Sequence, residues 1–317
     1  MSAYSVSEGS QEGHDTLVLA HREEELEAAF APGVGMVGCS LRHRGEELLG
    51  QRGGLAKYAE AGSSMGIPML HPWANRLDGL RYGVDGREVE LDPEATPLKL
   101  DPHGLPIHGL ATASPYWEVT DAGAGDHGAR LRARLDFAAH PELLAGFPFP
   151  HRLDVEIALA GRTLAIETTL TATGDVAVPV AFGYHPYLRL PGAPRPQWRV
   201  TLPVRRRARL DERGIPTGDA SPVRMVPGPL GARDFDDLFV ELVHPPEFLL
   251  EGAGRRLEVR FEQGYPVAQV YGPGSEEHVC FEPMTAPTNA LVSGQGLRLV
   301  PPGDRYLARF SVSVVSL

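Results

Sequence analysis

The chain has 317 residues, of which 42% are hydrophobic and 22% charged, as in an ordinary globular protein. Its net charge of −11 argues against general nucleic-acid binding, which needs a basic surface that neutralises phosphates. The only cysteines are Cys39 and Cys280, so the sequence has neither a disulfide framework nor a paired-cysteine metal motif.

The N-terminal segment is polar and rich in Ser, Gly and Glu. It lacks the apolar core of an export signal, and no window of the chain approaches 18 consecutive apolar residues. We therefore expect a disordered or weakly ordered tail over residues 1–15 and a single domain over residues 16–317. We also expect no association with membranes and a cytoplasmic location.

Beyond this tail, alternation of apolar and polar residues is the main structural signal. Residues 21–30 have a composition that suits a helix, but their alternation, continued by a strand-like run over 33–41, favours strands. Residues 153–159 and 164–170 both alternate, which predicts a hairpin with one apolar face and one polar face. The same period recurs over residues 131–137, 198–204, 257–261 and 306–314.

The 29 prolines and 36 glycines fall largely between these runs, and long helical patterns are scarce. No low-complexity linker or internal repeat divides the chain. The sequence therefore predicts an all-β fold with few short helices, in which two antiparallel sheets stack as a large β-sandwich with long loops at one end. The long loop over residues 66–108 is a favourable place for a binding site, because such loops on a rigid scaffold often carry function.

Two segments in or near this loop have side chains suited to binding. Asn75 offers a donor and an acceptor, and Arg76 offers a rigid fork of donors that suits vicinal hydroxyls or carboxylates. The alternative is a turn in which the arginine pairs with a structural carboxylate. His108 lies immediately before a glycine, and the alternative is a structural role, which is the more frequent one for a lone histidine.

His185 is the most informative residue of the chain. It lies between Tyr184 and Tyr187, just after a hydrophobic strand-like run, and Glu282 lies in similarly apolar company. An imidazole and a carboxylate in a cleft walled by aromatic rings suit proton transfer on a sugar. The rings stack on the C–H faces of a pyranose, and the two titratable groups address its oxygens.

Two weaker signals come from predicted strands. Asp236 and Asp237 lie between phenylalanines, and adjacent side chains of a strand point to opposite faces, so at most one enters a given cleft. Gln269 is a polar residue within an apolar run. A turn feature is the alternative for the acids, and simple exposure is the alternative for the glutamine.

Taken in chain order, these segments resemble those of the aldose 1-epimerases, or galactose mutarotases, over most of residues 33–315. No single motif is decisive, but seven in the same order are hard to reach by chance. The similar segments are residues 72–77, 107–109, 184–187, 235–239, 266–272, 279–283 and 301–304. The resemblance implies a galactose mutarotase-like β-sandwich as the catalytic domain.

The resemblance also implies an activity: interconversion of the α and β anomers of a free aldohexose, with His185 as the general acid and Glu282 as the general base. It implies that the sugar is bound by Asn75, Arg76, His108, Asp236 and Gln269. We expect no metal, nucleotide or redox cofactor, a small-molecule sugar as the partner, and a monomer or homodimer.

This chain departs from the family pattern at three positions. The family usually has Asn before the catalytic histidine and Ser after it, whereas Tyr184 and Pro186 stand here. Its aspartate is usually followed by His, whereas Asp237 stands here. These departures leave the acid and base intact but leave the hydroxyl specificity open.

Three alternatives remain from the sequence. A hexose 6-phosphate 1-epimerase of the same superfamily would need extra cations at the pocket rim, for which Arg81, Arg189 and Arg195 are candidates. A non-catalytic sugar-binding or regulatory protein could share the scaffold, although binding alone does not need a matched acid and base. The third is a structural β-sandwich in which each of these polar residues only makes hydrogen bonds within the fold.

Overall fold

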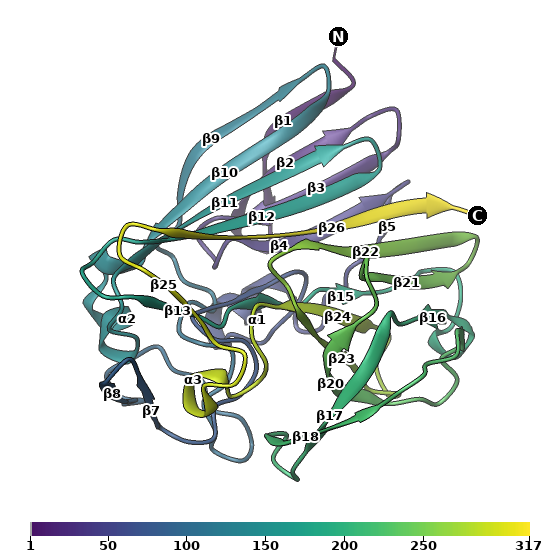
Figure 1. Cartoon of the computed structure of the whole chain (residues 1–317). Coiled ribbons are helices and arrows are strands. Elements are labelled where there is room, and N and C mark those ends of the chain that lie inside the picture. The colour runs from purple at the N-terminus through teal and green to yellow at the C-terminus, as the bar shows by residue number, and fades with distance from the viewer. Residues whose placement is uncertain (1) are drawn as a thin grey trace.

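The computed structural model describes residues 2–317, and most of its regular structure consists of antiparallel strands (Figure 1). The prediction of an all-β fold with few short helices is confirmed. The largest sheet contains, in spatial order, β19 (Gly228–Pro229), β16 (Arg199–Thr201), β21 (Glu247–Gly252), β22 (Arg255–Gln263), β26 (Arg305–Ser316), β12 (Thr163–Ala172), β11 (His151–Ala160), β10 (Gly128–Asp136) and β9 (Glu118–Gly125).

Strands β11 and β12 form the hairpin that the sequence predicted. Leu153 pairs with Leu170, and Ile157 pairs with Ile166, in an unbroken antiparallel register. All four side chains are buried, while the residues between those of β11 are only partly buried. One face of this sheet therefore supplies the core, as its alternation requires.

The second sheet carries most of the candidate site. Its strands are, in spatial order, β18 (Pro216–Pro222), β17 (Val204–Leu210), β20 (Phe235–Leu242), β23 (Val267–Gly272), β24 (Val279–Met284), β14 (Gly183–Tyr184) and β6 (Met69–Leu70), and β15 (Tyr187–Leu188) also pairs with β24. Figure 1 shows this sheet below the long strands of the first. Aromatic rings join the two: Phe248 of β21 stacks on Phe281 of β24, and Tyr184 of β14 packs on Phe310 of β26.

The expectation of a weakly ordered tail over residues 1–15 is wrong for the residues that the structure describes. The N-terminal sheet consists of β1 (Tyr4–Gln11), β2 (His14–His21), β3 (Leu26–Ala31), β4 (Val37–His43) and β5 (Glu46–Glu47). Strand β1 pairs with β2 along its whole length. The ring of Tyr4 stacks on His21, with 4.2 Å between centroids, and its hydroxyl accepts a hydrogen bond from the Gly161 backbone N–H at 2.8 Å. These contacts anchor a segment whose composition alone suggested disorder.

A second correction concerns residues 198–204. Their alternation predicts one strand, but they contain the whole of β16 and the first residue of β17. Strand β16 ends at Thr201, and β17 begins at Val204 in the other sheet. Pro203, between them, has no N–H to donate to a strand partner. The chain therefore crosses from one sheet to the other at this point.

The remaining elements are short. Strands β7 (Arg81–Val84) and β8 (Arg87–Glu90) form a hairpin within the predicted long loop, and β13 (Val178–Val180) pairs with β25 (Arg298–Val300). The helices are α1 (Gly54–Ala61), α2 (Pro141–Gly146), α3 (Ala290–Ser293) and two single 3₁₀ turns, η1 (Phe137–Ala139) and η2 (Arg195–Gln197). Within residues 2–317, no helix has the length and apolar character needed to cross a bilayer.

Candidate active site

One cavity brings together all seven residues that the sequence singled out. Its volume is about 390 Å³, within the range of roughly 300–1,000 Å³ that is usual for small-molecule sites. The seven lining residues are Asn75, Arg76, His108, His185, Asp236, Gln269 and Glu282. They come from three loops and three strands, far apart along the chain, so the fold and not the local sequence creates the site.

His185 and Glu282 are in direct contact on the cavity wall. The distance between His185 Nε2 and Glu282 Oε1 is 3.2 Å, and both side chains are almost fully buried. The register of β23 and β24 places Glu282 opposite Gln269, while Tyr187 stacks on the imidazole with 4.3 Å between ring centroids. Neither His185 Nδ1 nor Glu282 Oε1 has a hydrogen-bond partner among residues 2–317.

Burial favours the neutral forms of both groups. It lowers the pKa of His185 well below its ordinary value, an effect to which the nearby His108 and His278 add. Burial raises the pKa of Glu282 well above its ordinary value, and the negative charge of Asp236 adds to this effect. The expected mutual stabilisation of imidazolium and carboxylate is thus outweighed by desolvation in the unliganded protein. The pair nevertheless holds one proton, whichever partner carries it.

Two loops that pair with each other present the polar side chains of one wall. The His108 N–H donates to the Asn75 carbonyl oxygen at 2.9 Å, and both residues have left-handed backbones, with φ of 64° and 57°. Gly109 follows with φ of 74°, close against the His71 carbonyl group. A Cβ atom at Gly109 would lie 2.1 Å from the His71 oxygen, so only glycine fits this contact.

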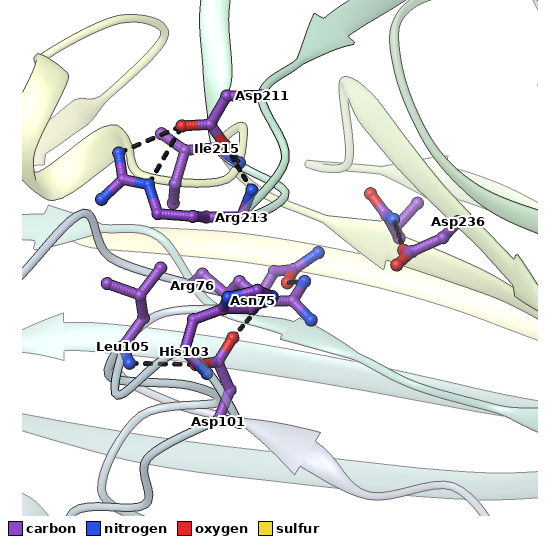
Figure 2. A network of polar contacts seen from close by, with 10 residues as sticks. Asn75, Arg76, Asp101, His103, Leu105, Asp211, Arg213, Ile215 and Asp236 are labelled. Carbon is purple, nitrogen blue, oxygen red and sulfur yellow. Dashed lines mark hydrogen bonds and ion pairs between the residues drawn. The ribbon is translucent and has the colours of Figure 1, made fainter.

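Arg76 lies at the centre of a polar network (Figure 2). Its Nε donates to Asp101 Oδ2 at 2.7 Å, and its Nη1 donates to Asn75 Oδ1 at 3.0 Å. Burial opposes ionisation of Asp101, but hydrogen bonds from the Leu105 N–H, Arg76 and the His103 N–H outweigh it and lower the pKa of this carboxyl. Arg76 therefore does pair with a structural carboxylate, as one reading of the sequence expected, and it also lines the cavity.

A turn that follows β17 holds Arg76 from the other side. Asp211 accepts hydrogen bonds from the backbone N–H groups of Arg213 and Ile215, as Figure 2 shows. Arg213 also forms an ion pair with Asp78 at 2.7 Å. The Gly214 backbone of this turn comes so close to Arg76 that a Cβ atom there would lie 3.1 Å from Nη1. The guanidinium is thus restrained on several sides.

The adjacent acids of β20 point in opposite directions, as a strand requires. Asp236 lines the cavity and accepts a hydrogen bond from Gln269 Nε2 at 2.6 Å. Asp237 instead pairs with Arg207 at 3.2 Å, a residue whose side chain is more than half exposed. The structure thereby decides which of the two faces the candidate site.

Comparison with known proteins identifies the family. Residues 37–313 match the family described as aldose 1-epimerase. The chain belongs to the aldose 1-epimerase family. It is 25% identical to Escherichia coli YihR, an uncharacterized protein, over 252 residues that cover 77% of each chain.

Solved structures show the same fold as this aldose 1-epimerase family member. A galactose mutarotase-like protein from Clostridium acetobutylicum has a TM-score of 0.84 at 18% identity, with 98% of each chain covered. Slr1438 from Synechocystis has a TM-score of 0.79 at 24% identity, with the same coverage. A galactose 1-epimerase from Lactobacillus acidophilus has a TM-score of 0.78 at 14% identity, with 97% of each chain covered. The predicted galactose mutarotase-like β-sandwich is confirmed.

The three departures from the family pattern lie outside the cavity lining. The Tyr184 hydroxyl forms a buried hydrogen bond with Thr168 at 2.7 Å, and its ring packs on Phe310 between the sheets. Pro186 is absent from the lining, and Asp237 faces Arg207. The departures therefore change the core and the outer surface and leave the residues of the cavity wall in place.

Sequence reasoning missed several lining residues of this family member. Arg52, Lys99 and Asp101 line the cavity, together with Ser63 and Ser64. None belongs to a recognisable motif. The one available signal was compositional, because Lys99 is one of only two lysines in a chain with many arginines.

The three arginines that the sequence offered as cations for a 6-phosphate do not line this cavity. Arg81 pairs with Glu90 at the exposed hairpin of β7 and β8, and Arg195 is buried with Nη2 donating to the carbonyls of Gly272 and Arg233. Arg189 is also absent from the lining. These three candidates were wrong because their positions depend on tertiary contacts that no local pattern encodes.

Proposed function

We propose that the protein is a mutarotase, an aldose 1-epimerase that interconverts the α and β anomers of an aldohexose. The observation that carries this proposal is the contact between His185 and Glu282 on the wall of a cavity large enough for a small molecule. A general acid and a general base on one wall are what reversible ring opening requires. A protein that only binds sugar would gain nothing from such a pair.

The reaction consists of two proton transfers. Glu282, as the carboxylate, takes the proton of the anomeric hydroxyl while His185, as the imidazolium, protonates the ring oxygen, and the bond between the ring oxygen and C1 breaks. Rotation about the C1–C2 bond then presents the other face of the aldehyde. Reversal of both transfers closes the ring as the other anomer, and no proton is gained or lost overall.

The substrate itself prepares the pair for this reaction. In the unliganded protein burial favours a neutral imidazole and a protonated carboxyl, at 3.2 Å from each other. Sugar hydroxyls that donate to Glu282 would favour its carboxylate form, as the charge of Arg76 already does. The proton then resides on His185, where the ring oxygen can receive it.

The other polar residues of the wall bind the hydroxyls of the sugar. Arg76 and Asn75 offer donors and an acceptor, and Asp236 accepts from hydroxyls beside Gln269, whose Oε1 has no partner among residues 2–317. Burial lowers the pKa of His108 to about 3, so this imidazole is neutral and can either donate or accept. An epimer that leaves these buried groups unpaired would be discriminated against.

Polarimetry on fresh α-D-glucose and α-D-galactose tests the proposal. The wild-type protein should accelerate the approach to the equilibrium rotation of at least one aldose, because ring opening proceeds unaided in water and needs only positioned proton transfers. Heat-inactivated protein is the control. If neither these two aldoses nor glucose 6-phosphate responds, the protein is not a mutarotase. A sugar-binding role then becomes the better explanation.

Replacement of the two adjacent acids separates sugar binding from surface pairing. Asp236→Asn should lower kcat/KM by roughly 10- to 100-fold, because a charged acceptor contributes about 1.5–3 kcal/mol to a hydrogen bond. Asp237→Asn is the matched control and should change kcat/KM by less than about fivefold, since it breaks only a surface ion pair with Arg207. Equal losses in the two variants would contradict the assignment of Asp236 to the sugar.

A further inference from the structure

One end of the cavity is lined by two cationic residues and two serines. Lys99 Nζ donates to the Gly62 carbonyl oxygen at 2.7 Å, and Arg52 Nη1 donates to the Ser64 carbonyl oxygen at 3.5 Å. Both cations are therefore held by the same short segment, residues 62–64, which follows α1. Ser63 and Ser64 of that segment also line the cavity. We refer to Arg52, Ser63, Ser64 and Lys99 as the cationic end.

We propose that the cationic end binds an anionic group on the exocyclic C6 of the sugar, so that the preferred substrate is a charged aldose. The candidates are a 6-phosphate, a 6-sulfonate or a 6-carboxylate. This inference rests on the proposed mutarotase function and specifies its substrate class.

The carboxylates of the cavity do not neutralise this end. Asp101 is bonded to Arg76, Asp236 is bonded to Gln269, and Glu282 is in contact with His185. Within residues 2–317, Lys99 has no carboxylate oxygen within 4.0 Å. Burial and the charge of Arg52 both lower the pKa of Lys99. A bound anion would compensate the ammonium charge.

Arg52 is only partly committed to the protein. Its Nε lies 3.4 Å from Glu276, whose side chain is partly exposed, and its Nη1 donates to the Tyr187 hydroxyl at 3.3 Å. The remaining guanidinium N–H groups are free to meet a ligand. Lys99 keeps two ammonium protons beyond the one that it donates to Gly62. Together with the two serines, the cationic end presents enough donors for an anion with several oxygens.

The position of the cationic end relative to His185 selects the sugar carbon. The Tyr187 hydroxyl lies 3.5 Å from His185 Nε2 and 3.3 Å from Arg52 Nη1, so it separates the acid from the cationic end by one side chain. In the proposed reaction His185 protonates the ring oxygen, which is bonded to C5. Because C5 carries C6, a group on C6 lies on the His185 side of the ring. That group is the one able to reach Arg52 and Lys99.

The test compares charged and neutral aldoses with Lys99 variants of the full-length protein. Mutarotation and binding by calorimetry are measured with glucose, glucose 6-phosphate, a 6-sulfonated glucose and glucuronate. We expect wild type to prefer at least one charged sugar over glucose by roughly 10- to 100-fold in kcat/KM. Lys99→Gln should reduce that preference by a similar factor, and Lys99→Arg should restore most of it. The exposed Lys57→Gln on α1 is the matched control and should keep the wild-type preference.

The outcomes separate this inference from the proposed function. Acceleration of glucose with no preference for any charged sugar would overturn the cationic end and leave the mutarotase proposal intact. If the protein accelerates mutarotation of no sugar, the mutarotase proposal is overturned. The calorimetric binding data would then be the remaining test of whether the cationic end binds an anionic group. Binding of a charged sugar that weakens in Lys99→Gln but not in Lys57→Gln would support the role of the cationic end. Equal binding by all variants would reject it.

Discussion

Glu282→Gln should reduce the acceleration of anomer interconversion by roughly 10²- to 10⁴-fold, the usual contribution of one positioned proton transfer. Glutamine keeps the shape of the side chain but can neither take nor return a proton. His185→Asn should have a loss of similar size. Because the two proton transfers belong to the same ring-opening step, the groups act as a unit, and the double variant should be little worse than either single variant. Polarimetry with each variant measures these rates.

Matched controls for this experiment lie on exposed parts of the chain. Glu88→Gln on β8 and His127→Asn in the turn before β10 make the same chemical changes outside the cavity, and both should retain wild-type rates. Thermal unfolding should show that all variants are folded. Wild-type rates in Glu282→Gln and His185→Asn would end the assignment of acid and base.

Gly109→Ala should strongly destabilise the protein. The added Cβ would lie 2.1 Å from the His71 oxygen and 2.3 Å from its carbon, and both are backbone atoms that cannot rotate away. The clash would push His108 away from Asn75, so activity should fall together with the melting temperature. We expect a loss of about 2–5 kcal/mol, from the left-handed backbone and the overpacking combined.

Gly104→Ala separates the two causes. Gly104 has φ of 75°, almost the value at Gly109, but a Cβ atom there would meet nothing within 4 Å. This variant should lose only the roughly 1–2 kcal/mol that a left-handed alanine costs. Equal shifts in melting temperature for the two variants would show that the contact with His71 is unimportant.

The strands could be predicted because their burial follows directly from alternation. The hairpin of β11 and β12 has one buried face, so the period of two in the sequence and in the structure agree. The opposite directions of Asp236 and Asp237 follow from the same pleat. Local periodicity thus fixes which face a side chain occupies within one strand.

Periodicity carries no information about which strands meet. Residues 198–204 alternate continuously, yet the chain changes sheet at Pro203. The N-terminal strand β1 has a polar composition, and its order comes from pairing with β2 and from contacts as distant as Gly161. In the same way, Arg52 reaches the cavity from the turn before α1, and Lys99 from the connection between β8 and β9, and no motif marks either residue.

The protonation of the site was the least predictable feature. His185 and Glu282 could be identified from their surroundings in the sequence, but not how far each would be buried. Nearly complete burial favours the neutral form of each group in the unliganded protein, not the imidazolium and carboxylate that catalysis uses. Desolvation depends on every atom that packs around a group, so it belongs to the whole fold.

Burial of this pair also links folding to acidity. In the unfolded chain Glu282 ionises above about 4.5 and His185 loses its proton above about 6.5, so between these values both the folded and the unfolded pair bind one proton. At higher pH the unfolded pair binds none while the native pair keeps its proton, until Glu282 ionises within the folded protein. At lower pH the unfolded pair binds two. A mildly acidic medium is therefore where these two residues disfavour the native state least.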